Sequence, residues 1–117
     1  MFVKSYGEVK PATPAEVTGT VRLREMITSR DGAPNFALRV FDLEPGASTP
    51  LHAHPWEHEV FIVQGAGHLR GKERTLSFQA GDSVFVAPGE THCFAADAGT
   101  ALQFVCVIPN PSPDGCR

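Results

Sequence analysis

Glycine and proline interrupt this chain so often that its apolar segments are only a few residues long. The sequence holds 11 glycines and 10 prolines, and short stretches rich in Val, Phe, Ile and Leu lie between them. No ten-residue window shows the 3.6-residue apolar period of an amphipathic helix. The pattern predicts an all-β protein made of short strands and turns, with little or no helix.

The predicted strands are short and evenly spread along the chain. We expect them at residues 21–28, 36–43, 59–64, 68–69, 75–78, 83–86, 92–95 and 101–108, with turns at 31–35 and 80–82 and a hairpin turn at Gly65-Ala66-Gly67. So many strands in 117 residues favour a sandwich or a barrel. Small antiparallel barrels often enclose one ligand cavity among their inward side chains.

Length and charge limit the organisation and the partners. We expect an N-terminal arm or edge strand over 1–20, a single domain over 21–109 and a flexible tail over 110–117. The net charge is −3 with scattered Lys and Arg, so no nucleic-acid partner is expected. No segment has the roughly 20 apolar residues of a membrane span, and no secretory signal is visible.

Three cysteines favour reduced thiols over a disulfide framework. We therefore expect a cytoplasmic protein.

The histidines form the most informative pattern. Four of the five in the sequence follow turns that could direct them inward: His52, His54, His58 and His92. His52 and His54 point to the same side of an extended chain, because strand side chains alternate. Neutral imidazole is a common ligand for transition metals, so the pattern predicts a metal site. The alternative is a set of solvated loop histidines. The fifth histidine, His68, stands apart from the others in the sequence, and we interpret it as a surface residue.

These residues also resemble the two sequence motifs of the cupin family. The first motif runs glycine, five residues, His-x-His, three or four residues, an acidic residue, six residues, glycine. The chain matches it with these residues: Gly46, His52, His54, then His58 or Glu59, and Gly65. The second motif is matched by Gly81, Pro88-Gly89 and His92, while Ala87 and Ala96 replace its first proline and its asparagine. The resemblance covers about three-quarters of the chain, Val21 to Pro109.

The resemblance implies an antiparallel jelly-roll β-barrel that pairs into a homodimer by strand exchange. Within the family, the chain is most similar to small single-domain cupins that bind manganese through four histidines. This resemblance makes Mn²⁺ the expected ion, with Fe, Zn, Ni or Cu as alternatives. His58 and Glu59 compete for one ligand position, because neighbouring residues on a strand face opposite ways. We favour His58 and expect Glu59 to point outward or to hydrogen-bond behind the imidazoles.

The pocket around the metal is predicted from strand alternation. Phe104, Cys106 and Ile108 share one face of the last strand, and Arg39 and Phe41 share one face of the second. If both faces look inward, the pocket is aromatic and aliphatic with one cation. Trp56 lies between the candidate ligands, where it either covers the site or braces the loop. Such a pocket suits a small apolar or aromatic molecule with one anionic or enolisable group.

Ordinary explanations exist for each pocket residue. Each of the Phe and Ile side chains, taken singly, is more often ordinary core. The alternative for Arg39 is a solvated strand charge. A buried cysteine such as Cys106 is usually a small hydrophobe, although near a redox metal it could also be oxidised. We keep Arg39 and Cys106 as candidate catalytic residues.

The leading functional hypothesis is a metal-dependent dioxygenase that acts on a C=C or C–C bond. It rests on family analogy, since one fold hosts many functions. A metal-dependent isomerase or lyase is the second hypothesis. A non-enzymatic sensor of a small molecule or a metal is the third. Whether the protein is an enzyme is therefore left open by the sequence.

Overall fold

The computed structural model describes residues 1–110 as eight strands and two short 3₁₀ helices. The predicted flexible tail, from residue 111 onward, lies outside the described residues. In chain order the elements are η1 Tyr6–Glu8, β1 Val21–Ile27, η2 Ser29–Asp31, β2 Phe36–Leu43, β3 His58–Gln64, β4 Ala66–Arg70, β5 Thr75–Gln79, β6 Ser83–Val86, β7 Cys93–Ala96 and β8 Leu102–Pro109. The prediction of an all-β chain is confirmed.

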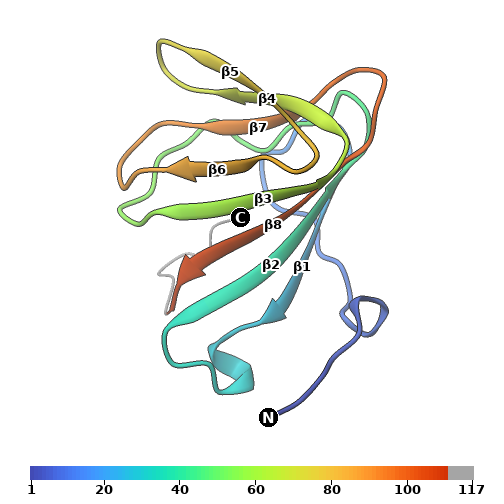
Figure 1. The fold of residues 1–117 in the computed structure, drawn as a ribbon, viewed down its shortest axis with the longest axis vertical. Helices are drawn as coiled ribbons and strands as arrows, with labels where there is room; N and C mark the ends of the chain where they lie inside the picture. The colour runs from blue at the N-terminus through green and yellow to red at the C-terminus, as the bar shows by residue number, and fades with distance from the viewer. Residues whose placement is uncertain (111–117) are drawn as a thin grey trace.

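The strands form two antiparallel sheets that share one core. The larger sheet has the order β1-β2-β8-β3-β6 and the smaller one β5-β4-β7, and Figure 1 shows them as the lower and upper parts of the molecule. Phe94 of β7 stacks on Phe104 of β8 with ring centroids 4.7 Å apart. The inner faces of the two sheets therefore pack on each other, as in a jelly-roll barrel.

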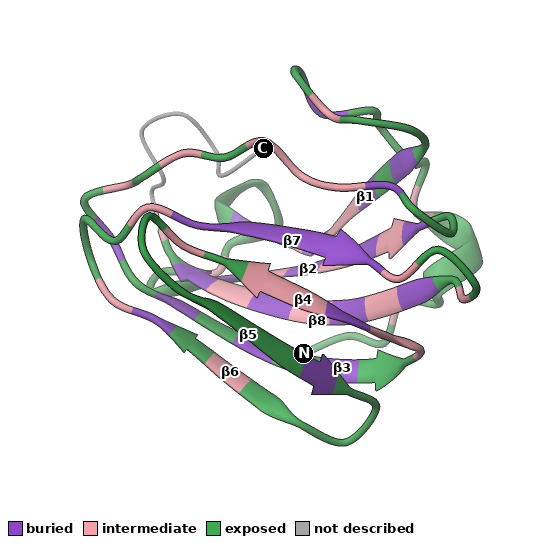
Figure 2. Ribbon diagram, turned by 90° about the horizontal axis from the view of Figure 1, so that it is seen from above, coloured by how far each residue is buried: buried purple, intermediate pink, exposed green. Residues whose placement is uncertain are grey.

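Burial alternates along the central strands. On β2 and β8 every second residue is buried, as the changing colours along β8 in Figure 2 show. The two strands pair so that Arg39 lies opposite Cys106 and Phe41 opposite Phe104. Since paired residues project from the same face of a sheet, all four of these side chains point into the barrel, in agreement with the predicted alternation.

The hairpin turn predicted at Gly65-Ala66-Gly67 is wrong. Ala66 and Gly67 belong to β4, and β3 and β4 lie in different sheets. Gly65 alone makes the crossing, with φ of 91°, a conformation that L side chains rarely adopt. Gly67 has a different role, which is close packing. A Cβ on Gly67 would lie 2.1 Å from the carbonyl oxygen of Ala95.

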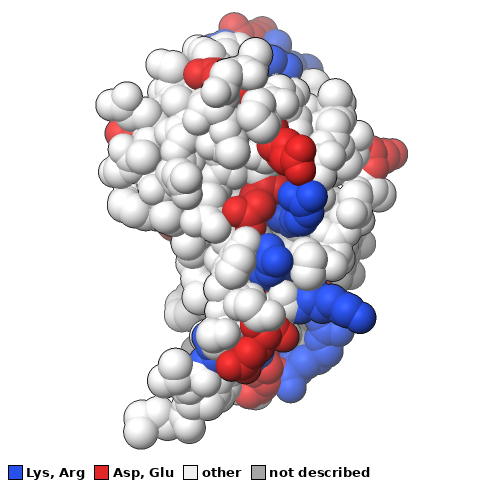
Figure 3. All heavy atoms as spheres, turned by 90° about the vertical axis from the view of Figure 1, so that its right-hand side faces the viewer, with Lys and Arg blue, Asp and Glu red and all other residues white. Residues whose placement is uncertain are grey.

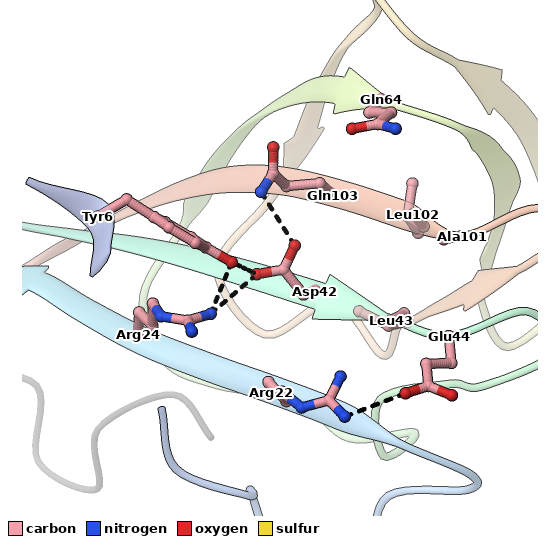
Figure 4. A pocket seen from close by; sticks show the side chains of 10 residues that line it. All are labelled: Tyr6, Arg22, Arg24, Asp42, Leu43, Glu44, Gln64, Ala101, Leu102 and Gln103. Atoms are coloured by element: carbon pink, nitrogen blue, oxygen red, sulfur yellow. Dashed lines mark hydrogen bonds and ion pairs between the residues drawn. The ribbon is translucent and has the colours of Figure 1, made fainter. Parts of the chain in front are cut away.

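The N-terminal segment is fastened to the outer face of the larger sheet. Ala12 forms an isolated antiparallel bridge with Leu23 of β1. Further along, the Tyr6 hydroxyl donates to Asp42, and the Arg24 guanidinium donates to the same hydroxyl at 2.6 Å. Figure 4 shows these side chains meeting over the strands, with Gln103 donating to Asp42 from β8. These hydrogen bonds tie the N-terminal segment to β1 and β2, and through Asp42 to β8.

Candidate metal centre

Two loops and one strand end bring the histidines together. His52 and His54 lie in the connection between β2 and β3, His58 is the first residue of β3, and His92 immediately precedes β7. His52 and His92 are joined by a two-way backbone bridge: the His52 N–H donates to His92 at 3.1 Å, and the His92 N–H donates back at 2.9 Å. This bridge fixes the two loops to each other, so the His52 and His92 imidazoles converge although neither residue belongs to a regular strand.

Three of the imidazoles have the spacing of a metal site. One ring nitrogen each from His52, His54 and His92 lies within 4.8 Å of the others. The Nε2 atoms of His52 and His54 are 3.0 Å apart. Two nitrogens bound at right angles to one ion, each at about 2.1 Å, lie about 3.0 Å from each other. The donor set therefore fits a divalent transition metal.

His92 presents a defined nitrogen to the cluster. Its Nδ1 lies 2.8 Å from the carbonyl oxygen of Glu90. A carbonyl can only accept, so Nδ1 carries the proton and Nε2 keeps its lone pair. Such a hydrogen bond behind the ring is the usual way in which proteins fix the orientation of a ligating imidazole.

His58 faces the same cluster, and Glu59 does not. The His58 ring centroid is 4.8 Å from that of His92 and 5.3 Å from that of His54, and the residue is only 2% exposed. Glu59 is exposed on the other face of β3, where a hydrogen bond with the neighbouring Glu57 carboxyl raises its pKa. His58 is thus the member of this pair that lies on the inner face.

The cluster is electrically suited to hold a cation only because its imidazoles stay neutral. Burial, and to a smaller extent the neighbouring imidazoles and Arg39, lower the pKa of His52 to about 4 and that of His58 to about 3. Burial also lowers the pKa of His92. At neutral pH these rings therefore keep a lone pair for a metal.

A small aromatic cavity adjoins the histidines. It has a volume of about 20 Å³, room for about one water molecule. Its lining consists of Arg39, Phe41, Thr49, His52, His58, His92, Phe94, Phe104 and Cys106. Phe104 stacks between Phe41 and Phe94, with centroids 4.9 Å and 4.7 Å away. The imidazoles thus adjoin an apolar wall.

Arg39 is a buried cation of this cavity. It is 1% exposed, so the alternative of a solvated strand charge does not describe it. One guanidinium nitrogen donates to the Cys106 sulfur at 2.9 Å, and the guanidinium carbon lies 5.0 Å from the Phe41 ring centroid. A buried guanidinium presents N–H donors and a positive charge to the cavity, which suits an anionic ligand.

The other predicted pocket residues divide into two groups. Phe41, Phe104 and Cys106 line the cavity as expected. Trp56 and Ile108 are buried but do not line it. Trp56 instead stacks on His54, with ring centroids 4.5 Å apart, and Ile108 belongs to the hydrophobic core.

Thr49 and Phe94 line the cavity and were missed from the sequence. Phe94 could have been found, because it lies two residues after His92 and so shares its side of an extended chain. Thr49 has no comparable signal, since it lies in a loop. Its hydroxyl accepts the Phe94 N–H at 2.9 Å, which connects the loop between β2 and β3 to β7 beside the cavity.

His68 lies apart from the cluster. Its Nδ1 is 2.9 Å from an Asp97 carboxylate oxygen, and the side chain is partly exposed on β4. Cys93 and Cys106, the two cysteines in the described part of the chain, are buried thiols. Figure 3 shows Lys and Arg side chains intermixed with Asp and Glu on one face of the molecule. No helix in residues 1–110 is long and apolar enough to cross a membrane.

Comparison with known proteins places the chain in a family. Residues 39–108 match the family model of the cupin domain. The chain therefore belongs to the cupin family, and the fold expected from the resemblance is confirmed.

Three relatives show the range of proteins that this chain resembles. An oxalate-binding protein from Thermotoga maritima is 33% identical over 116 residues, which cover 92% of this chain and 93% of the relative. An (R)-mandelonitrile lyase from Granulicella tundricola is 31% identical over 91 residues, covering 77% and 69%. The structure of the polyketide cyclase RemF from Streptomyces resistomycificus superposes with a TM-score of 0.87 at 32% identity, covering 97% of this chain and 82% of RemF.

Proposed function

We propose that this cupin is a metal-dependent enzyme that binds a small organic anion between a divalent ion and Arg39. His52, His54, His58 and His92 hold the ion in this proposal. The observation that carries it is the burial of Arg39 in the same cavity as the imidazoles. A buried guanidinium pairs strongly with a carboxylate or an enolate, which a metal ion also attracts.

The histidine set would give the ion its chemical character. Four neutral imidazoles leave the full +2 charge on a divalent ion, which would act as a Lewis acid and offer open coordination positions to a substrate. By resemblance Mn²⁺ is our first choice of metal. Fe, Zn, Ni and Cu also suit nitrogen donors.

The chain's own residues supply binding and shielding. Arg39 would hold the anionic end of the substrate. Phe41, Phe94 and Phe104 would contact its apolar part and exclude water, which strengthens the electrostatic attraction. Because the cavity of about 20 Å³ holds about one water molecule, substrate entry requires the aromatic side chains to move apart.

The reaction class has two candidates. The hypothesis of a dioxygenase acting on a C=C or C–C bond remains our first candidate. A reaction without oxygen is the second, and it is favoured by the relatives named as a lyase and as a cyclase. The relative named as an oxalate-binding protein makes oxalate a suitable probe of the anion site.

The experiment combines metal analysis with substrate tests. The purified protein should hold one divalent ion per chain, and dissolved oxygen should be followed with catechols, β-diketones and alkenyl phenols. Oxygen uptake that disappears in His52→Ala supports the dioxygenase. Turnover without oxygen uptake supports the second reaction class. Metal binding without turnover of any compound contradicts an enzymatic role for these substrate classes.

The anion site is tested with a matched pair of arginine variants. Oxalate should raise the thermal stability of the metal-loaded protein, and Arg39→Met should remove most of this effect. Arg70→Met is the control, since Arg70 is exposed at the end of β4. Equal responses to oxalate in both variants would contradict the role proposed for Arg39.

A further inference from the structure

Cys106 occupies a position between the buried cation and one histidine of the cluster. Its sulfur accepts from the Arg39 guanidinium at 2.9 Å and lies 3.4 Å from the Nδ1 of His58. Neither the side chain of Arg39 nor that of Cys106 is more than 1% exposed, and His58 is 2% exposed. The three groups therefore form a continuous buried chain from β2 through β8 to β3.

The sheet register fixes this arrangement. On β8, Cys106 is paired with Arg39 of β2 on one side and with Val60 of β3 on the other. His58 precedes Val60 by two residues and shares its inner face. The sulfur is consequently held between the two side chains by the backbone ladder of three adjacent strands.

Arg39 makes the sulfur the acceptor of one hydrogen bond. A guanidinium has only donors, so the sulfur accepts from it. If the sulfur also accepts a hydrogen bond from His58, the proton of the His58 ring lies on Nδ1 and Nε2 keeps its lone pair. His92 has the same arrangement, with its Nδ1–H donated to the Glu90 carbonyl.

We infer that Cys106 is a positioning residue, whose sulfur, held by Arg39, accepts the Nδ1–H of His58 and leaves Nε2 as the ligand atom. The inference rests on the proposed metal site and adds to it the group that orients its fourth imidazole. A sulfur in this role acts through His58 and need not touch substrate or metal. Groups that hydrogen-bond behind a ligating imidazole contribute typically about 10- to 100-fold to metal affinity.

The first test reads the tautomer of His58 in the metal-free protein. With ¹⁵N-labelled histidine, the long-range ¹H–¹⁵N spectrum distinguishes a protonated ring nitrogen from one with a lone pair, and His58→Gln assigns the signals. We expect a protonated Nδ1 in the natural sequence and in Cys106→Ser, whose hydroxyl can still accept. Cys106→Ala should shift the population toward a protonated Nε2. A protonated Nε2 in the natural sequence, or no change in Cys106→Ala, overturns the inference.

The second test measures the dissociation constant for Mn²⁺ and Zn²⁺ by calorimetry. Cys106→Ala should weaken binding by about 10- to 100-fold, and Cys106→Ser should recover part of the loss. Cys93→Ala is the matched control, because Cys93 is also a buried thiol, follows His92 and points to the other side of its strand. Equal affinities in Cys106→Ala and Cys93→Ala overturn the inference. Failure of the natural sequence to bind either ion overturns the proposed metal site instead.

Discussion

The indole of Trp56 lies flat against the imidazole of His54. The two ring centroids are 4.5 Å apart, and the ring planes differ by only 7°. Trp56 was predicted as a pocket residue that covers the site or braces the loop. The stacking shows that it braces a candidate ligand, and the sequence holds no other tryptophan. Its emission therefore reports on this ring alone.

This stacking predicts that Trp56 fluorescence will respond to metal. Mn²⁺, Co²⁺ or Cu²⁺ held by His54 would lie next to the indole, where paramagnetic ions quench the excited state. Titration of the metal-free protein should give a saturable decrease that ends at one ion per chain. His68→Gln, which changes a histidine outside the cluster, should leave the decrease intact, and His54→Gln should weaken it. Unchanged emission in a protein shown by elemental analysis to hold an ion would contradict the site.

Metal removal should lower thermal stability. A ligand that binds only the folded chain at 100 times its dissociation constant stabilises it by about 2.7 kcal/mol, which is roughly 10 °C in Tm for a chain of this size. Chelation should therefore lower Tm by about this amount. His92→Ala should have the low Tm with or without metal, whereas His68→Ala should still respond. A Tm that chelation leaves unchanged would speak against a specific site.

Much of the fold was predictable because its signals are local. Strands β2 and β6 have the predicted bounds, since turn residues flank both segments. The inner face of β8 also followed from alternation. The crossing at Gly65 was not predictable in this way, because a glycine that turns a hairpin and one that passes between two sheets have the same local sequence. The close approach of Gly67 to Ala95 depends on pairing between distant strands.

The candidate site was predictable where spacing along one segment determines geometry. The sequence indicated four histidines, His52, His54, His58 and His92, and the nitrogens of all but His58 lie within 4.8 Å of one another. The Cys106 sulfur shows the limit of this reasoning. Alternation placed it on an inner face, but its contacts with Arg39 and His58 come from the order of three strands in a sheet. Thr49 likewise reaches the cavity through a loop contact with Phe94.

Gly65 should tolerate alanine much less well than a glycine with the same backbone conformation in open space. Gly65 and Gly81 have φ of 91° and 94°, but a Cβ on Gly65 would lie 2.0 Å from the Ala101 carbonyl oxygen, whereas nothing lies within 4 Å of one on Gly81. Gly81→Ala should cost about 1 to 2 kcal/mol for the backbone conformation. Gly65→Ala should cost about 1 to 3 kcal/mol more for the clash. Urea unfolding measures both, and equal losses would show that the crossing can relax.

Acid should destabilise the metal-free protein through its buried histidines. In the unfolded chain a histidine binds a proton near pH 6.5, whereas in the folded protein burial lowers the pKa of His52 to about 4 and that of His58 to about 3. The unfolded state thus binds more protons below pH 6.5, so the free energy of unfolding falls as the pH decreases toward these values.

Urea unfolding of the chelated protein between pH 7.5 and pH 4 measures this dependence. His58→Gln removes one of the titrating groups and should flatten the decrease, although it also lowers stability at pH 7.5. His68→Gln is the control for the loss of a histidine outside the cavity. A slope that is the same in His58→Gln and in the natural sequence would mean that the His58 imidazole accepts a proton in the folded protein as readily as in the unfolded chain.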